Sequence, residues 1–277
     1  MKLRERIGID LGRRVRLEEG IEWAAKNDIR YIDIQLDTAQ NAVTTFDAKR
    51  AAGVRAAAER HGIQIGLHTL SAVNVAEYSP YVADAVDEYL KSYVDIYPRL
   101  GASWMVVHAG YHFGSDRGLR MEAGLERLKR IVGYAEKKNA LILLENLNKE
   151  PEDAEVHYLA HTLEEWRYYF EKISSPALKL SFTVNHAHLV PEGVEGFADA
   201  LDFAMVGEVR LADCFRNGHE VHLRPGAGDL DFGNMFRRVE AKGFRGHYTN
   251  AFGTLEDMLA ARDYLVDRAR EAGVKIE

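Results

Sequence analysis

The sequence predicts an α/β protein that folds as a single (β/α)8 TIM barrel spanning residues 1–277. Three observations support this prediction. Eight short apolar segments are spaced along the chain, as expected for strands buried on both faces of a parallel sheet. Segments with a helical spacing of apolar residues lie between them. The chain has 277 residues, close to the roughly 250 that are typical of such barrels.

The eight expected strands follow one another in chain order, separated by expected helices. Their ranges are Arg6–Leu11, Ile29–Leu36, Ile63–Thr69, Ser103–Ala109, Ala140–Asn146, Leu178–Val184, Val206–Ala212 and Gly246–Ala251. Glycines expected to end helices are Gly62, Gly101 and Gly243, and expected N-caps are Thr44, Asp116, Thr162 and Thr254. A doubly wound open sheet is the main alternative, but the two glycines of IGIDLGRR have the wrong spacing for a dinucleotide-binding loop.

Composition excludes several classes of protein. Cys214 is the only cysteine, so no intrachain disulfide can form, and a reducing, cytoplasmic location is expected. No run of 18 apolar residues occurs, so we expect neither a membrane span nor a signal peptide. The formal net charge of −7 disfavours nonspecific binding to nucleic acid, because such binding depends on a basic surface.

Polar side chains are concentrated where the expected strands end. The segment LILLENLN places Glu145 at the end of a buried strand, and a buried carboxylate requires a partner. Other strand ends supply His68, His108, His186 and Arg210. A single histidine there is usually structural. A ring of such residues at the C-terminal mouth of a barrel, where barrel active sites lie, indicates an active site.

The order of these motifs resembles that of the xylose isomerase-like TIM barrels. The resemblance rests on HT in the third strand, GASWMVVHAG in the fourth, LLEN in the fifth, HAH after the sixth and GHEVHLRPGAGDLDF before the eighth. That superfamily includes sugar-phosphate isomerases and epimerases, ketose 3-epimerases and the endonuclease IV group. The resemblance implies an isomerase or epimerase that acts on a sugar or sugar acid, phosphorylated or not, through an enediolate stabilised by a metal ion.

The sequence departs from the metal site that this resemblance implies. In the sugar epimerases of the superfamily, Glu, Asp, His and Glu from strands 5 to 8 hold one divalent ion. Glu145 matches the first of these ligands, but Thr183, Arg210 and Asn250 stand at the other three positions. Threonine and asparagine are poor ligands, and a guanidinium repels a dication. We therefore expect an altered metal site.

Two alternatives remain open from the sequence. In the first, a zinc or manganese ion is held by His68, His108 and Glu145, which match another zinc position of the endonuclease IV group. Glu220, His222 and His186 match that group's third position. In the second, no metal is bound, and Arg210 acts on an enolate or on a substrate carboxylate or phosphate. In this second alternative Glu145, His186 or His222 serves as the acid or base, and these three are the expected catalytic residues.

Further substrate-binding residues are expected around this mouth. They are Arg210, Arg216, Arg224, His188, Asn250 and Trp104. His186 and His188 are two residues apart, so on an extended segment both would face the same side, and by the motif match His186 is the one expected to reach the pocket. The expected partner is a small sugar-like or anionic molecule, with no nucleic acid or membrane partner, and the resemblance leaves a homo-oligomer open. A dehydratase or lyase acting on a polyol, or a catalytically silent barrel that binds a small anion, are the alternative functions.

Overall fold

Eight parallel strands close into a barrel in the computed structural model, which describes residues 1–277. Around the barrel the strands follow the order β1-β10-β9-β8-β6-β4-β3-β2. Their bounds are β1 Ile7–Gly12, β2 Tyr31–Ile34, β3 Gln64–His68, β4 Trp104–Val107, β6 Ile142–Glu145, β8 Leu178–Thr183, β9 Val206–Leu211 and β10 His247–Asn250. Each lies within one of the eight expected segments, apart from the last residue of β1, so the predicted fold class is confirmed.

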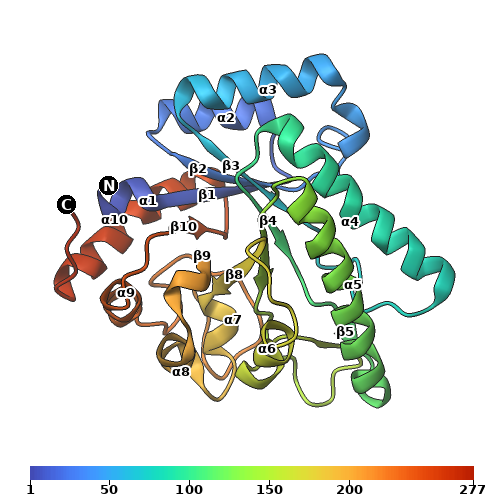
Figure 1. The fold of residues 1–277 in the computed structure, drawn as a ribbon. Helices are drawn as coiled ribbons and strands as arrows, with labels where there is room; N and C mark the ends of the chain where they lie inside the picture. The colour runs from blue at the N-terminus through green and yellow to red at the C-terminus, as the bar shows by residue number, and fades with distance from the viewer.

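The helices cover the outside of this barrel (Figure 1). They are α1 Leu3–Arg6, α2 Leu17–Lys26, α3 Ala48–His61, α4 Pro80–Leu100, α5 Arg117–Lys137, α6 Leu163–Phe170, α7 Val184–His188, α8 Gly193–Ala200, α9 Phe232–Ala241 and α10 Leu255–Glu271. Short 3-10 turns are η1 Val43–Thr45, η2 Gly114–Asp116 and η3 Phe203–Met205. None of these helices is both long and apolar enough to span a membrane.

Several of the expected helix ends are confirmed. Thr162 and Thr254 accept hydrogen bonds from the third residue of α6 and α10, and Gly62 and Gly101 end α3 and α4 with φ of +64° and +67°. The N-cap prediction for Thr44 was wrong. This residue lies within η1, and Asp47 caps α3 instead.

Aromatic side chains fill the floor of the barrel. Trp104 is the first residue of β4, and its ring packs against His247 at a centroid distance of 4.1 Å, while Tyr31 stacks on His247 at 4.7 Å. Gly66 makes room for this layer, because a Cβ there would lie 2.2 Å from the Trp104 indole. The floor is therefore closed, and the open end of the barrel is the C-terminal end of the strands.

A two-stranded antiparallel sheet lies beyond that end. β5 (Tyr111–His112) follows β4, and β7 (His157–Tyr158) follows β6. Pairing of the two fixes the long segment after β6, so that Tyr158 lines the cavity at the mouth.

Candidate active site

A polar cavity of about 250 Å³ occupies the C-terminal mouth of the barrel. Loops and strand ends from around the barrel contribute its lining, which is Asp10, Gln35, His68, Ser71, His108, Glu145, Leu147, Asn148, Glu150, Tyr158, His186, Arg210, Glu220 and His222. Thirteen of these fourteen side chains carry a polar or charged group, and Leu147 is the exception. The cavity therefore suits a small, hydroxyl-rich molecule.

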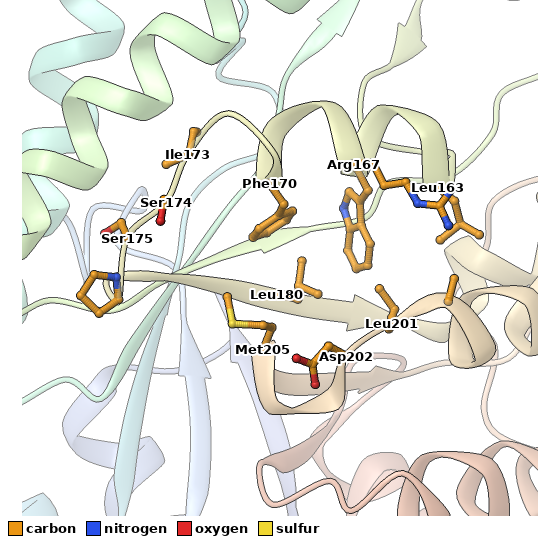
Figure 2. Close-up of a pocket in the computed structure, with 13 residues that line it drawn as sticks. Leu163, Arg167, Phe170, Ile173, Ser174, Ser175, Leu180, Leu201, Asp202 and Met205 are labelled. Carbon is orange, nitrogen blue, oxygen red and sulfur yellow. The ribbon is translucent and has the colours of Figure 1, made fainter.

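A larger cavity of about 530 Å³ lies on the outside of the barrel (Figure 2). Phe170 of α6 points toward Leu180 of β8, and Leu201 and Met205 complete the apolar wall. Arg167 and Asp202 are its only charged residues, and neither histidine nor cysteine lines it. The acid–base and ligand-type residues expected from the sequence are gathered in the smaller cavity at the mouth.

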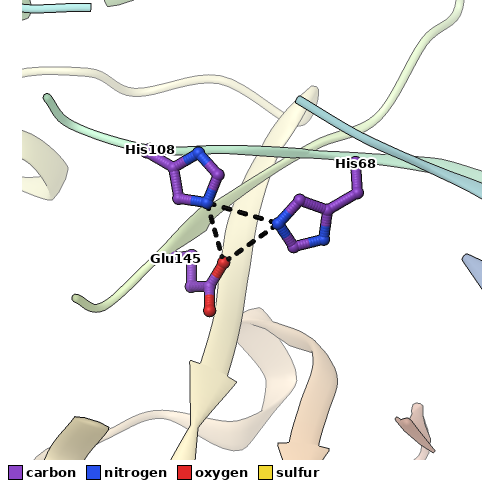
Figure 3. Close-up of side chains that lie close together, drawn as sticks. All are labelled: His68, His108 and Glu145. Atoms are coloured by element: carbon purple, nitrogen blue, oxygen red, sulfur yellow. Dashed lines mark hydrogen bonds and ion pairs between the residues drawn. The ribbon is translucent and has the colours of Figure 1, made fainter. Parts of the chain in front are cut away.

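His68, His108 and Glu145 come together at the ends of three adjacent strands (Figure 3). Nε2 of His68 lies 3.3 Å from Nε2 of His108, and Oε2 of Glu145 lies 3.5 Å and 3.2 Å from these two nitrogens. All three side chains are buried, and Oε2 has no hydrogen-bond partner. A tetrahedral zinc ion with ligand bonds of about 2.0–2.1 Å requires ligand atoms roughly 3.3 Å apart, so three ligand positions are already in place.

The electrostatics of this group favour a cation. Burial alone would raise the pKa of the Glu145 carboxyl, but contact with His108 and the charges of His108, His68 and Arg210 hold it well below its usual range. Burial lowers the pKa of His108. The lowered pKa of Glu145 favours its anion, and the lowered pKa of His108 favours the neutral imidazole that binds metal ions. Burial and Arg210 lower the pKa of His68, but Asp33 and Glu145 outweigh them and raise it.

Arg210 lies on the other side of Glu145, and its charge is met by carboxylates. Its Nη1 contacts Asp33 and also lies 3.0 Å from Glu208, its Nη2 lies 2.9 Å from Asp10, and its Nε lies 4.0 Å from Oε1 of Glu145. Burial would lower the pKa of Arg210, but Glu208, Asp33 and Asp10 raise it well above the usual value. A substrate carboxylate or phosphate would therefore meet a guanidinium that is already neutralised.

A second group of ligand-type residues is formed by His186, Glu220 and His222. Nδ1 of His186 donates to the carbonyl of Asn146 at 2.8 Å, and Nδ1 of His222 donates to the carbonyl of Ala251 at 2.6 Å. These bonds leave both Nε2 atoms facing Oε1 of Glu220, at 3.6 Å and 2.6 Å. Burial lowers the pKa of His222, but Glu220 outweighs it and raises the pKa above its usual value.

His188 lies outside the cavity, because residues 184–188 form helix α7 rather than an extended segment. Two helical residues advance about 200° around the axis. His186 therefore faces the mouth, whereas Nε2 of His188 contacts Asp229 at 2.8 Å. The expectation that both histidines face the same side was wrong for this reason.

Four other expected substrate-binding residues also lie away from the cavity. Trp104 is part of the barrel floor, as described above. Asn250 is buried and donates to a backbone carbonyl of α10 at 2.8 Å. Arg216 is exposed and contacts the carbonyl of Pro191, while Arg224 lines a separate outer cavity beside Tyr264. Of the six residues expected to bind substrate, the structure places only Arg210 at the mouth.

Several cavity residues had no clear signal in the sequence. Asp10 interrupts the first apolar segment, much as Glu145 ends the fifth, and this was the available clue. Ser71, Asn148 and Glu150 lie in loops and Tyr158 lies in the two-residue strand β7, and none of these segments has a periodic pattern in the sequence. Loop side chains reach the mouth through the path of the chain after β3 and β6, which residue spacing does not specify.

Comparisons with known proteins agree with the barrel fold. The model of the family described as xylose isomerase-like TIM barrel matches residues 21–265. A D-tagatose 3-epimerase-like protein is 20% identical with a TM-score of 0.81, covering 99% of this chain and 98% of the other. D-psicose 3-epimerase from Clostridium cellulolyticum H10 is 15% identical with a TM-score of 0.78, covering 99% and 100%. An L-ribulose 3-epimerase is 16% identical with a TM-score of 0.76, covering 97% and 95%. No curated protein matches the sequence.

Proposed function

Because the chain belongs to the xylose isomerase-like TIM barrel family, we propose that it is a sugar isomerase or epimerase. We further propose that it acts through an enediolate with one divalent ion held by His68, His108 and Glu145. Relatives of the same fold with sugar 3-epimerase names support the class of reaction. The observation that carries the proposal is the triangle of His68, His108 and Glu145 ligand atoms, with edges of 3.2–3.5 Å, at the bottom of the cavity.

A divalent ion would supply a partner that the buried side chains at this position lack. Oε2 of Glu145 faces Nε2 of both histidines and is buried without a hydrogen-bond partner. Three buried acidic side chains, Asp33, Glu145 and Glu208, lie near the single guanidinium of Arg210, and burial together with Glu208 raises the pKa of Asp33. An unpaired buried charge is costly, and a divalent cation at Oε2 would offset it.

When bound, such an ion polarises the carbonyl of a sugar and stabilises the enediolate. The chain's own groups then move the proton. The carbonyl of Asn146 accepts from Nδ1 of His186, so in the neutral tautomer that this bond selects, Nε2 is the nitrogen that can accept a proton. Glu220 raises the pKa of His222, which favours a proton at its Nε2. His186 therefore serves as the base and His222 as the acid, and Glu145 keeps its charge beside the reacting carbonyl.

The alternative of a silent barrel that binds an anion has less support. Arg210 is the only lysine or arginine that lines the cavity, and it is neutralised by Asp10, Asp33 and Glu208. Recognition of phosphate or carboxylate usually relies on a cation with free N–H donors. A neutral sugar with several hydroxyl groups suits the lining better.

Metal analysis of protein purified without chelator tests the proposed ion. We expect about one equivalent of zinc or manganese that is lost in His108→Ala. His188→Ala is the matched control, because it removes a buried histidine that lies outside the cavity. An ion count that is unchanged in His108→Ala would contradict the proposed ligands.

Deuterium incorporation from D2O into a panel of ketoses and aldoses, followed by NMR, tests the reaction. An isomerase or epimerase replaces a hydrogen beside the carbonyl with deuterium. Apart from this deuterium, the product has the same mass as the substrate. Loss of one water would identify a dehydratase instead. Absence of exchange with every sugar, in protein that retains its ion, would contradict the proposed reaction.

A further inference from the structure

The metal position of the sugar epimerases does not fit this chain. By the family resemblance, that ion would lie among Glu145 and residues 183, 210 and 250. Here the Thr183 hydroxyl donates to Oε1 of Glu145, and the Asn250 amide donates to a backbone carbonyl of α10. We propose that the guanidinium of Arg210 is a fixed cation that replaces this ion and positions Glu145 and Asp10.

The surroundings of Arg210 are those of a metal ion rather than of a surface arginine. The side chain is buried, and carboxylate oxygens lie on three sides of the guanidinium, from β1, β2 and β9 itself. Glu208 and Arg210 are two residues apart on β9, so both point into the barrel. Three carboxylates that converge on one point would repel one another without a cation among them, and Arg210 supplies that cation permanently.

Glu145 divides its two oxygens between the two cation positions. Oε1 accepts the Thr183 hydroxyl and lies 4.0 Å from Nε of Arg210. Oε2 faces the imidazole nitrogens of His68 and His108. The register supports this division, because Thr183 of β8 pairs with Arg210 of β9 on one side of β6 and the two histidines lie on the other. One oxygen is thus fixed by the chain, and the other is free for an exchangeable ion.

Asp10 is held by the same guanidinium. Its Oδ2 contacts Nη2 of Arg210 at 2.9 Å, and its Oδ1 accepts from the backbone of Gly12 at 2.7 Å. Asp10 lines the cavity, so Arg210 acts on the cavity through this carboxylate as well as through Glu145. Arg210 is therefore a positioning residue.

Restoring the missing ligands tests the replacement. The triple variant Thr183→Asp/Arg210→His/Asn250→Glu rebuilds the Asp, His and Glu that the family resemblance places here. We expect it to bind one more equivalent of manganese or cobalt than the wild type, measured by elemental analysis after gel filtration. The cobalt-loaded form should also show an additional visible absorption band. A folded triple variant that gains no equivalent would overturn the inference.

If the triple variant does not fold, two single variants test whether Arg210 replaces the ion. Arg210→Lys retains a cation, and Thr183→Val removes only the hydroxyl, so the ion count should equal that of the wild type in both. A lower count in Thr183→Val would show that an ion occupies the Arg210 side, and would overturn the inference.

Both this inference and the proposed function involve Glu145, but the ion counts of the variants test them separately. Each result is a difference in ion count from the wild type, so an ion bound at His186, Glu220 and His222 does not affect it. If His108→Ala leaves the count unchanged but the triple variant gains an equivalent, the proposed ligands fail and the replacement by Arg210 stands. The opposite pair of results supports the proposed ligands and overturns the replacement.

Discussion

The two sides of Glu145 differ in how a positive charge is supplied. On the Oε2 side are the imidazoles of His68 and His108 and a carboxylate oxygen without a hydrogen-bond partner. These groups can bind an exchangeable metal ion. On the Oε1 side, Arg210 supplies a cation that is covalently part of the chain and cannot be removed by a chelator. A barrel mouth can thus keep the charge distribution of a metal centre at a position where its ligands have been replaced.

The largest expected effect on stability comes from removing the fixed cation. Arg210→Met leaves the carboxylates of Asp10, Asp33 and Glu208 without a partner, and breaking a buried ion pair costs about 3–5 kcal/mol. Urea unfolding in the presence of EDTA measures this loss. Arg210→Lys keeps the charge and should lose clearly less. Equal losses in the two variants would show that shape, rather than charge, is what Arg210 contributes.

Removing the shared carboxylate should affect the exchangeable side most. We expect Glu145→Gln to lose the bound ion and to reduce turnover by about 10²–10⁴-fold, because both the charge at Oε2 and its acid–base support are lost. Elemental analysis and deuterium exchange measure the two effects. Glu150→Gln removes another carboxylate of the cavity lining and should keep the ion. Retention of the ion in Glu145→Gln would contradict the account.

Lowering the pH should release the ion at Oε2 of Glu145 before it breaks the ion pairs of Arg210. Metal-binding imidazoles must be neutral, so the ion should be released as the pH falls below about 6. Burial would raise the pKa of Glu208, but Arg210 and His247 outweigh it and lower it to about 2. A depressed carboxyl pKa stabilises the fold above the ordinary value of 4.5, and this contribution is lost only as the pH falls toward 2. At pH 5 the protein should be free of metal but folded, as dialysis with elemental analysis and circular dichroism would show. Joint loss of ion and fold would contradict this separation.

A smaller effect is expected from the residue behind His68. Oδ2 of Asp33 lies 3.6 Å from Nδ1 of His68, in the position of a carboxylate that orients a metal-bound histidine. Asp33→Asn should weaken metal affinity by about 10–100-fold, as is usual for such outer partners. Competition with a chromogenic chelator measures this change. An unchanged affinity would show that Asp33 pairs with Arg210 but does not orient His68 for metal binding.

The barrel and the His68, His108 and Glu145 group were predictable from the sequence. Parallel strands end at the same edge, so polar residues at the ends of β3, β4 and β6 must meet. The partners of Arg210 were not predictable, because Asp33 and Asp10 are 177 and 200 positions away in sequence. The separation of His186 from His188 depended on one turn of helix after β8, which a five-residue segment does not specify.

Trp104 shows how a small error in position changes an interpretation. It was expected among the residues that bind substrate around the mouth. Four residues of strand extend about 13 Å, so the start and the end of β4 lie at different levels of the barrel. Trp104 therefore packs in the floor, and only His108 reaches the mouth.

Anomalous X-ray diffraction from crystals grown with zinc or manganese distinguishes the two sides of Glu145. We expect an anomalous peak at bonding distance, about 2.0–2.2 Å, from Nε2 of His68, Nε2 of His108 and Oε2 of Glu145, and no peak among Glu145, Thr183 and Arg210. A peak on the Arg210 side, or none beside the two histidines in protein that carries a stoichiometric ion, would contradict this expectation.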